Sequence, residues 1–387
     1  MRLCWYSNAP DTPTGYGNQT QQVIRRMAQD GHAVHVLANY GQIAGVRDWH
    51  GIPIWPQGHA NYSLDVLDDL AGFLQPDHIL TLYDVWVLRG VWKDRSVISW
   101  TPIDHYPPPP DVLRWAREHR TIAMSRFGQE ALREQGIEAD YIPHAVEDVF
   151  APSPSDIRER MKVPEDAFLV SINAANIGVT PPRKAWGENL QAMATFMARH
   201  EDVYLYLHTD LVRPNGVPLP ILVNALGMPM DRLRKVDLMA YRAGLIDELE
   251  LARIYSASDV LLATSKGEGF GIPVLEAMAC GTPAIVSDFS AQPEIVGDAG
   301  WKVPVQLDWD HNQGAFFATP LVGAILAALE EAYEQRGTRR EACLARAAEY
   351  RADKVYAESW RPFLASLDGP KRKGLSNAAK RRARRAA

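Results

Sequence analysis

Short apolar runs alternate with helical patterns along nearly the whole chain, and this alternation constrains the fold more than any other feature. In the first half, strands are predicted at 2–7, 32–38, 78–83, 96–102, 121–125 and 140–146. Helical patterns lie between these runs, such as the one over 127–136. Strands joined through helices run parallel, with right-handed crossovers and helices on both faces of the sheet. The predicted fold class is therefore α/β.

The alternation is interrupted near residue 150, where three prolines and mixed charge predict an interdomain linker. A second alternation follows, with strand patterns at 168–175, 203–209, 259–265 and 283–288 and long helical patterns at 318–335 and 339–351. The predicted divisions are a Rossmann-like domain over 1–150, a linker over 151–165, a second Rossmann-like domain over 166–350, a C-terminal helix over 351–368 that can cross back to the first domain, and a tail over 369–387. Two such domains leave a cleft, and ligands of open parallel sheets bind beyond the carboxyl ends of the strands.

Composition excludes several classes of protein. The 387 residues are 47% hydrophobic, which is enough for a core in each domain. No apolar run approaches the ~20 residues that a membrane-spanning helix needs. The three cysteines, Cys4, Cys280 and Cys343, are far apart and odd in number, which argues against a disulfide framework and a zinc cluster. We therefore expect a cytoplasmic protein.

Charge is unevenly distributed along the chain. The net charge is −6, but residues 369–387 contain eight basic residues and no acidic one, so the rest of the chain carries −6 − 8 = −14. A basic tail on an acidic body suggests contact with nucleic acid or with an anionic membrane surface, and the latter would make the protein peripheral to a membrane. The other interpretation is a solvated chain end.

The segment EGFGIPVLEAMACG, residues 268–281, contains the most informative pattern. It follows the strand pattern at 259–265, so Glu268 is expected in a loop at the carboxyl edge of the sheet and Glu276 near the start of the next helix. Pro273 suits the first turn of that helix. The glycines allow a ligand to approach the backbone, and the free N–H groups of the first turn attract a phosphate. A carboxylate can accept two hydrogen bonds from a vicinal diol. The pattern therefore predicts a site for a sugar that carries both phosphate and ribose.

In the form EGFGxPxLEAMACGTPAI, this segment resembles the glutamate–seven–glutamate motif of retaining, nucleotide-sugar-dependent glycosyltransferases of the GT-B fold (group 1, family 4-like). The resemblance is specific from Tyr255 to Glu294 and continues more weakly to Trp360. It implies two Rossmann-like domains that face each other across a cleft. The 1–150 domain would lie on the acceptor side, and the 166–350 domain would bind the nucleotide sugar.

The resemblance also implies roles for individual residues. Glu276 would bind the ribose hydroxyls of the nucleotide, and Glu268 would contact the donor sugar. Backbone amides would contact the sugar and the diphosphate; the residues concerned are Gly269, Phe270, Gly271, Val274 and Leu275. The alternative is an ordinary loop and helix start with solvated glutamates.

Two adjacent cations, Arg183 and Lys184, open a helical pattern after the first strand of the second domain. Both suit a diphosphate, and they would stabilise the nucleotide leaving group as its bond to the sugar breaks. The family has a Gly-Arg pair before a Lys-Gly pair at this place. Here Lys184 matches, whereas the earlier arginine is absent and Arg183 is only a candidate substitute.

Two segments of the first domain are further candidates. The loop DTPTGYGNQT, residues 11–20, places Gly15, Tyr16 and Gly17 after the first strand, where the family has a loop that faces the donor diphosphate. A plain turn is the alternative. His105 follows the strand at 96–102, where the family often has a histidine, and it would orient the donor sugar. His144 stands where the family usually has asparagine, and its role is open.

The predicted reaction is glycosyl transfer from a nucleoside-diphosphate sugar with retention, and the sequence offers no obvious nucleophile for a covalent intermediate. No cofactor or metal is expected. Asp308-Trp309-Asp310 fits the letters of a DxD metal motif but lies outside the pattern that would support one. The donor base is left open, and so is the acceptor, which could be a glycan, a lipid-linked group, a protein or a modified nucleic acid. The alternatives are a nucleotide-sugar epimerase or a phosphorylase with the same architecture, and a binding role for the basic tail.

Overall fold

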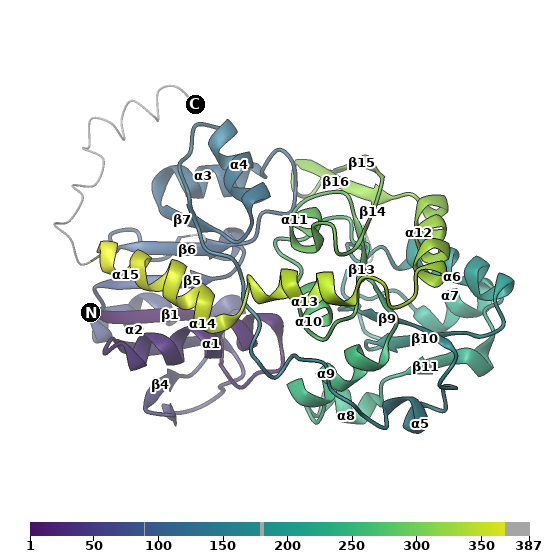
Figure 1. Ribbon diagram of the computed structural model, residues 1–387. Coiled ribbons are helices and arrows are strands. Elements are labelled where there is room, and N and C mark those ends of the chain that lie inside the picture. The colour runs from purple at the N-terminus through teal and green to yellow at the C-terminus, as the bar shows by residue number, and fades with distance from the viewer. Residues whose placement is uncertain (89, 179–181, 368–387) are drawn as a thin grey trace.

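Two parallel sheets, one in each half of the chain, organise the fold, and they form two lobes that lie side by side (Figure 1). The computed structural model describes residues 1–88, 90–178 and 182–367. The predicted α/β class is confirmed. The basic tail and its predicted contacts lie outside the described residues.

The sheet of the first lobe has eight strands in the order β3-β4-β2-β1-β5-β6-β7-β8, and all neighbours are parallel except β3 and β4. Their bounds are β1 Arg2–Asn8, β2 Ala33–Tyr40, β3 Arg47–Trp49, β4 Ile52–Trp55, β5 His78–Leu82, β6 Val97–Thr101, β7 Arg120–Ala123 and β8 Asp140–Tyr141. Side chains of β1 alternate between two cores: Leu3 and Trp5 pack in the core that contains α1, whereas Cys4 and Tyr6 pack in the core that contains α2. Both faces of β1 are therefore covered, which explains its uninterrupted apolar sequence.

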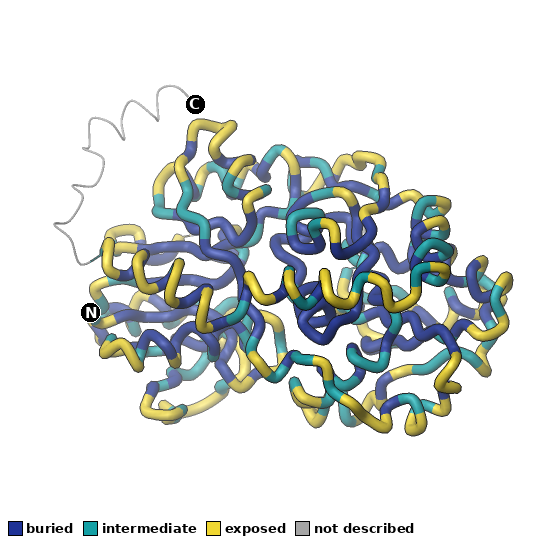
Figure 2. The backbone as a smooth tube through the Cα atoms, viewed as in Figure 1, coloured by how far each residue is buried: buried dark blue, intermediate teal, exposed yellow. Residues whose placement is uncertain are grey.

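The second sheet has six parallel strands in the order β11-β10-β9-β12-β13-β14. The bounds are β9 Phe168–Asn173, β10 Val203–His208, β11 Leu233–Lys235, β12 Val260–Leu262, β13 Ala284–Ser287 and β14 Trp301–Val303. Val170 and Ile172 of β9 pack in the core that contains α6, and Leu169 packs on the opposite face near α5 and α9. In both lobes the central strands are largely buried (Figure 2).

Helices connect the strands in both lobes. The first lobe contains α1 Gly15–Gln29, α2 Leu67–Leu74, α3 Pro110–Glu118 and α4 Arg126–Glu134. The second contains α5 Ile157–Met161, α6 Trp186–Arg199, α7 Leu219–Ala225, α8 Leu238–Arg242, α9 Glu248–Ala257, α10 Ile272–Ala279, α11 Gln292–Val296, α12 Val322–Glu334 and α13 Arg340–Ala348. Single 3₁₀ turns lie at Asn61–Ser63, Val85–Leu88 and Met230–Arg232. Side-chain caps start several helices, as when Ser125 accepts from the Gly128 N–H at 3.0 Å before α4.

Part of the predicted linker is folded onto the second lobe. Residues 157–161 form α5, and Ile157 is buried against the sheet. Arg158 donates to Asp259 at 2.8 Å and to the Ala257 carbonyl at 3.0 Å. The helical pattern IRERM accounts for this helix, whereas the prolines around it had suggested an extended linker.

After α13 the chain crosses from the second lobe and covers the first one (Figure 1). This segment consists of α14 Ala352–Val355, a π-helical turn at Tyr356–Trp360 and α15 Arg361–Leu367. Trp360 is buried against Trp5 and Trp100, with ring centroids 5.8 and 5.0 Å apart. Arg361 forms a paired ion bridge with Asp30 at 2.9 Å. Aromatic packing thus attaches the C-terminal segment to the first sheet.

A two-stranded hairpin that the sequence did not suggest lies between β14 and α12. Its strands, β15 Val305–Asp310 and β16 Ala315–Pro320, are antiparallel and separate from both sheets. The helix predicted from residue 318 begins only at Val322, because Ala318–Pro320 belong to β16. The mostly apolar sequence from Ala315 to Ile325 concealed this boundary.

Candidate functional site

The glutamate-containing loop leaves the second sheet at the carboxyl end of β12, as predicted. Helix α10 starts immediately after Gly271, whose φ of +113° favours glycine, and Pro273 lies in its first turn. Phe270 and Leu275 are buried, and Val274 lines a cavity next to the loop. The N-terminus of α10 lies next to the other lobe. A Cβ placed on Gly15 would be 3.3 Å from Ile272 Cδ1.

Glu268 lies between the two predicted cations. Arg183 Nη1 donates to its Oε2 at 2.7 Å, and Lys184 Nζ forms an ion pair with its Oε1. Arg183 also donates to the Gly267 carbonyl at 2.8 Å, which ties it to the same loop. Burial opposes ionisation of Glu268, but the two positive charges outweigh it and lower its pKa to about 2. Burial and the Arg183 charge lower the pKa of Lys184, and Glu268 opposes that change.

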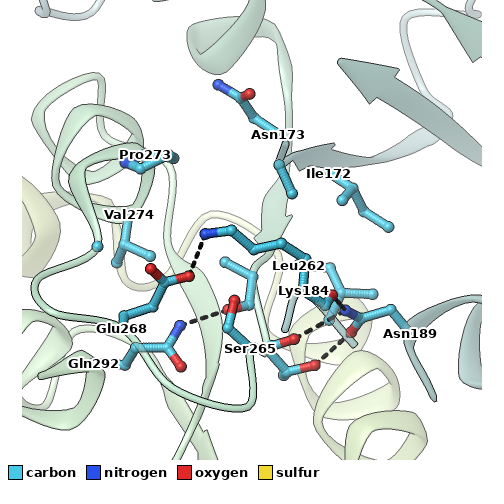
Figure 3. A pocket seen from close by; sticks show the side chains of 14 residues that line it. Ile172, Asn173, Lys184, Asn189, Leu262, Ser265, Glu268, Pro273, Val274 and Gln292 are labelled. Atoms are coloured by element: carbon cyan, nitrogen blue, oxygen red, sulfur yellow. Dashed lines mark hydrogen bonds and ion pairs between the residues drawn. The ribbon is translucent and has the colours of Figure 1, made fainter. Parts of the chain in front are cut away.

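A cavity of about 20 Å³ lies between this ion cluster and the ends of β9 and β12 (Figure 3). Its wall contains Asn173, Lys184, Ser265, Glu268 and Val274, and Lys184 reaches Glu268 across it. The volume suffices for about one water molecule, whereas ligand pockets span roughly 300–1,000 Å³. A sugar diphosphate therefore exceeds the space that this cavity offers.

Glu276 is a buried residue of α10 and does not line this cavity. Its Oε2 accepts a hydrogen bond from the Tyr255 hydroxyl at 3.0 Å, and Asn173 Nδ2 donates to the same hydroxyl at 2.6 Å. Burial raises the pKa of Glu276 to about 8, although the Tyr255 hydrogen bond acts in the opposite direction. The carboxyl group is thus neutral at pH 7 and linked through Tyr255 to the end of β9.

The first lobe places His105 and two carboxylates near the ion cluster. His105 is buried, and its Nδ1 lies 2.7 Å from Asp104 Oδ1. Burial raises the pKa of Asp84 to about 6, and the nearby Asp104 charge adds to this effect. Burial also acts on Asp104, but the hydrogen bond with His105 lowers its pKa. Arg183 influences both carboxylates, so the acidic groups of the first lobe face the cations of the second.

The two lobes touch directly beside these groups. A Cβ placed on Gly267 would lie 2.2 Å from the Asp104 carbonyl oxygen, and one placed on Gly269 would lie 2.2 Å from Pro102 Cβ. Glycine is therefore required at both positions by the approach of the other lobe. The glycines of the motif serve domain contact as well as access to the backbone.

The segment 11–20 is partly helical, although a loop was predicted. Helix α1 begins at Gly15, because the Thr14 side chain caps it by accepting from the Gly17 N–H at 3.0 Å. A Cβ on Gly17 would lie 2.2 Å from the Thr12 carbonyl oxygen, so this glycine permits the tight entry to the helix. Tyr16 packs edge-on against Tyr83 with centroids 5.3 Å apart. Residues 15–17 thus form the first turn of a helix that faces α10.

His144 and Lys266 make contacts within the fold. His144 is buried with Trp100, and its Nδ1 is 3.0 Å from Gln19 Oε1. Burial lowers the pKa of His144 to about 3, which indicates a neutral structural residue. Lys266 contacts Glu188 at 3.2 Å and Thr319 at 3.1 Å, so it supports the loop from behind.

Two acidic residues near the site were missed by the sequence analysis. Asp84 lies two residues after β5, and its position directly after the strand predicted at 78–83 was a usable signal. Asp310 was noted only for the letters of a metal motif, but it lies at the end of β15, with its Oδ2 3.5 Å from His105 Nε2. No sequence pattern linked residue 310 to residue 105. Within the described ranges, no group of three His, Cys, Asp or Glu side chains is arranged to hold a metal ion.

The family of the second lobe follows from comparison with known proteins. Residues 243–349, which include the loop and α10, match the model of the glycosyl transferases group 1. We call this matching segment the group 1 domain. The chain is 34% identical over 152 residues to the MMP alpha-(1->4)-mannosyltransferase of Mycolicibacterium hassiacum, covering 39% of this chain and 31% of that protein. A D-inositol 3-phosphate glycosyltransferase of Mycobacteroides abscessus is 29% identical, over 30% of this chain and 29% of its own length. The chain thus matches about a third of the length of these curated relatives.

Solved structures confirm the GT-B fold around the group 1 domain. Sucrose-phosphate synthase from Thermosynechococcus elongatus superimposes with a TM-score of 0.73 at 18% identity, covering 95% of this chain and all of that one. HepE from Anabaena, in complex with UDP-glucose, gives a TM-score of 0.67 at 17% identity with the same coverage. Among the helices of the described residues, none is both long and apolar enough to cross a membrane.

Proposed function

We propose that this chain is a retaining glycosyltransferase that moves a sugar from a nucleoside-diphosphate sugar to an acceptor. The observation that carries the proposal is the ion cluster in and beside the group 1 domain. There Glu268 is held by Arg183 and Lys184 at the carboxyl ends of the strands. These are the groups that a sugar diphosphate needs: two cations for the phosphates and one ionised acceptor for sugar hydroxyls.

In this proposal the diphosphate replaces Glu268 as the partner of Arg183 and Lys184. The α10 N-terminus adds backbone N–H groups on the same side. As the sugar–phosphate bond breaks, negative charge grows on the leaving nucleotide, and these groups stabilise it. Glu268, released from its ion pairs, then accepts hydrogen bonds from the donor sugar.

Glu276 is assigned to the ribose of the donor. It lies eight residues after Glu268 and is joined through Tyr255 to Asn173, which lines the cavity. A shift of α10 or of Tyr255 would expose this carboxyl group to a diol. UDP-glucose in HepE and the mannosyltransferase relative support a hexose on a nucleoside diphosphate as the donor class.

Retention without a covalent intermediate fits the residues at the site. Glu268 is assigned to the hydroxyls of the donor sugar, and no other carboxylate of the described residues lines the cavity beside it. We therefore assign a same-face reaction, in which the acceptor hydroxyl gives its proton to the leaving phosphate while its oxygen bonds to the anomeric carbon. His105 and Glu268 orient the sugar, and contact between the lobes excludes water. In this proposal Arg183 and Lys184 stabilise the leaving nucleotide without a metal or other cofactor. We propose that the reaction takes place in the cytoplasm.

A nucleotide-sugar epimerase or a phosphorylase is not favoured, because none of the relatives and neighbours described above is named as one. The acceptor is unidentified.

The test is turnover of a panel of UDP-, GDP- and ADP-sugars, measured as release of the nucleoside diphosphate with and without oligosaccharide, lipid and protein acceptors. One donor should be consumed, and NMR of the product should show the anomeric configuration of that donor. Lys184→Gln should abolish release, whereas the exposed Lys302→Gln should not. The proposal would be contradicted if the wild type released no nucleoside diphosphate from any donor, or if the product had the inverted anomeric configuration.

A further inference from the structure

The β15–β16 hairpin follows β14 of the second lobe and contacts both lobes. Tyr106 and Phe316 exchange two backbone hydrogen bonds of 3.1 Å, which forms an antiparallel bridge between the lobes. At the hairpin turn, a Cβ placed on Gly314 would lie 3.6 Å from Pro110 Cδ. The hairpin thus lies alongside residues 106–110, which come directly after His105 in the sequence.

The same hairpin is attached to the loop that carries Glu268. The Ala318 N–H donates to the Lys266 carbonyl at 2.9 Å, and Lys266 Nζ donates to Thr319 Oγ1 at 3.1 Å. One hairpin therefore connects the cation–glutamate cluster of the second lobe with the histidine of the first.

Two hairpin side chains fix the His105 ring. Phe317 stacks on the imidazole with centroids 3.7 Å apart and planes 27° apart. Asp310 Oδ2 lies 3.5 Å from Nε2, while the other ring nitrogen is 2.7 Å from Asp104. Nε2 is buried and makes no hydrogen bond within the described part of the chain, so Asp310 is the charge that it faces.

Asp310 is itself held in place. Its side chain is 6% exposed, and the Asn312 N–H donates to its other oxygen at 2.8 Å, which leaves Oδ2 directed toward His105. An imidazole can carry a proton on either ring nitrogen, and the groups around it decide which one. Asp104 acts on one nitrogen from the same lobe, and Asp310 acts on the other from the opposite lobe.

We propose that the β15–β16 hairpin completes the active site from the opposite lobe, with Asp310 as a positioning residue that sets the orientation and proton placement of the His105 imidazole. The contact exists only while the lobes are together, so His105 reaches its working arrangement on closure. This inference rests on the proposed function, in which His105 orients the donor sugar.

The first measurement does not depend on catalysis. The full chain is labelled with ¹⁵N-histidine, and the ring nitrogens are observed by two-bond ¹⁵N–¹H correlation, with His105→Gln identifying the His105 signals. Asp310→Asn keeps the size of the side chain and the oxygen that accepts from Asn312. It should move the Nε2 resonance of His105, whereas Asp308→Asn, at an exposed position of the same strand, should leave it in place.

The second measurement is steady-state kinetics with the donor that the wild type consumes. Asp310→Asn should lower kcat by about 10- to 100-fold, the usual loss when a group that orients a working imidazole is removed. The KM for the donor should stay within about twofold, because the phosphate-binding groups are untouched. Asp308→Asn should match the wild type.

The inference is supported only if the His105 resonance moves and kcat falls together. An unmoved resonance, or an unchanged kcat in a variant whose resonance has moved, overturns it. If the wild type consumes no donor, the proposed function fails by itself, and the NMR comparison still decides whether Asp310 positions the ring.

Discussion

Replacing Glu276 by glutamine should stabilise the protein at neutral pH, and the gain should grow as the pH rises. In the folded protein the pKa of Glu276 is about 8, against an ordinary value of 4.5, because the carboxyl group is buried. The folded state therefore holds this proton more tightly than the unfolded state does. The stability that the protonated group contributes is complete below about pH 4.5 and is lost as the pH rises toward 8.

The magnitude follows from the shift. Each pH unit between the two pKa values changes the free energy of unfolding by about 1.4 kcal/mol. Between about pH 5.5 and 7.5 the wild type should therefore lose about 3 kcal/mol that Glu276→Gln does not lose. Glutamine retains an oxygen that can accept from the Tyr255 hydroxyl, so the variant keeps the main contact of the side chain.

Urea unfolding followed by tryptophan fluorescence at about pH 5.5, 6.5 and 7.5 measures this difference. Subtracting the free energy of unfolding of the variant from that of the wild type removes the contributions of all other titrating groups. Glu165→Gln, at an exposed position of the same lobe, is the control and should give a difference that is constant with pH. A Glu276→Gln difference that is equally flat would refute the assignment of a buried, neutral carboxyl group.

Three further predictions concern stability and closure. Glu268→Gln should destabilise the protein at pH 7 by about 3 kcal/mol, since the pKa of Glu268 is lowered from 4.5 to about 2. This stabilisation is present above pH 4.5 and vanishes as the pH falls through 2. A stability difference between variant and wild type that stays the same in calorimetry at about pH 2 would contradict the prediction. Trp360→Ala should cost about 3–5 kcal/mol by leaving a cavity between two indoles of the first lobe, and an unchanged urea midpoint would show that the C-terminal segment is not part of that core. Gly269→Ala places a Cβ 2.2 Å from Pro102 and should increase the radius of gyration in X-ray scattering, whereas Gly187→Ala on α6, with its nearest neighbour at 3.8 Å, should not; equal radii would argue against a tight contact between the lobes.

Much of the architecture was predictable because buried parallel strands have continuous apolar sequences. The strands β1, β2, β9 and β10 were located within a few residues, whereas the GT-B arrangement was predicted from the family resemblance. The β15–β16 hairpin was missed for the opposite reason. Most of β15 is exposed and mixes polar with apolar residues, while β16 runs without a break into α12.

The site was predictable where one segment carries it and unpredictable where distant segments meet. Glu268 and its glycines share one loop, so their spacing could be interpreted directly. The pairing of Glu268 with Lys184 joins residues 84 positions apart, and only the resemblance suggested that both serve one ligand. The contact of His105 with Asp310 crosses the lobes, and its existence depends on how they pack.

Calorimetric titration with UDP, GDP and ADP tests the central claim most directly, because it asks whether the cation–glutamate cluster is a diphosphate site. At least one nucleoside diphosphate should bind the wild type, and the combined change of Arg183 and Lys184 to glutamine should weaken its affinity by at least about 100-fold, or about 2.7 kcal/mol. The same affinity in that variant as in the wild type would contradict the account.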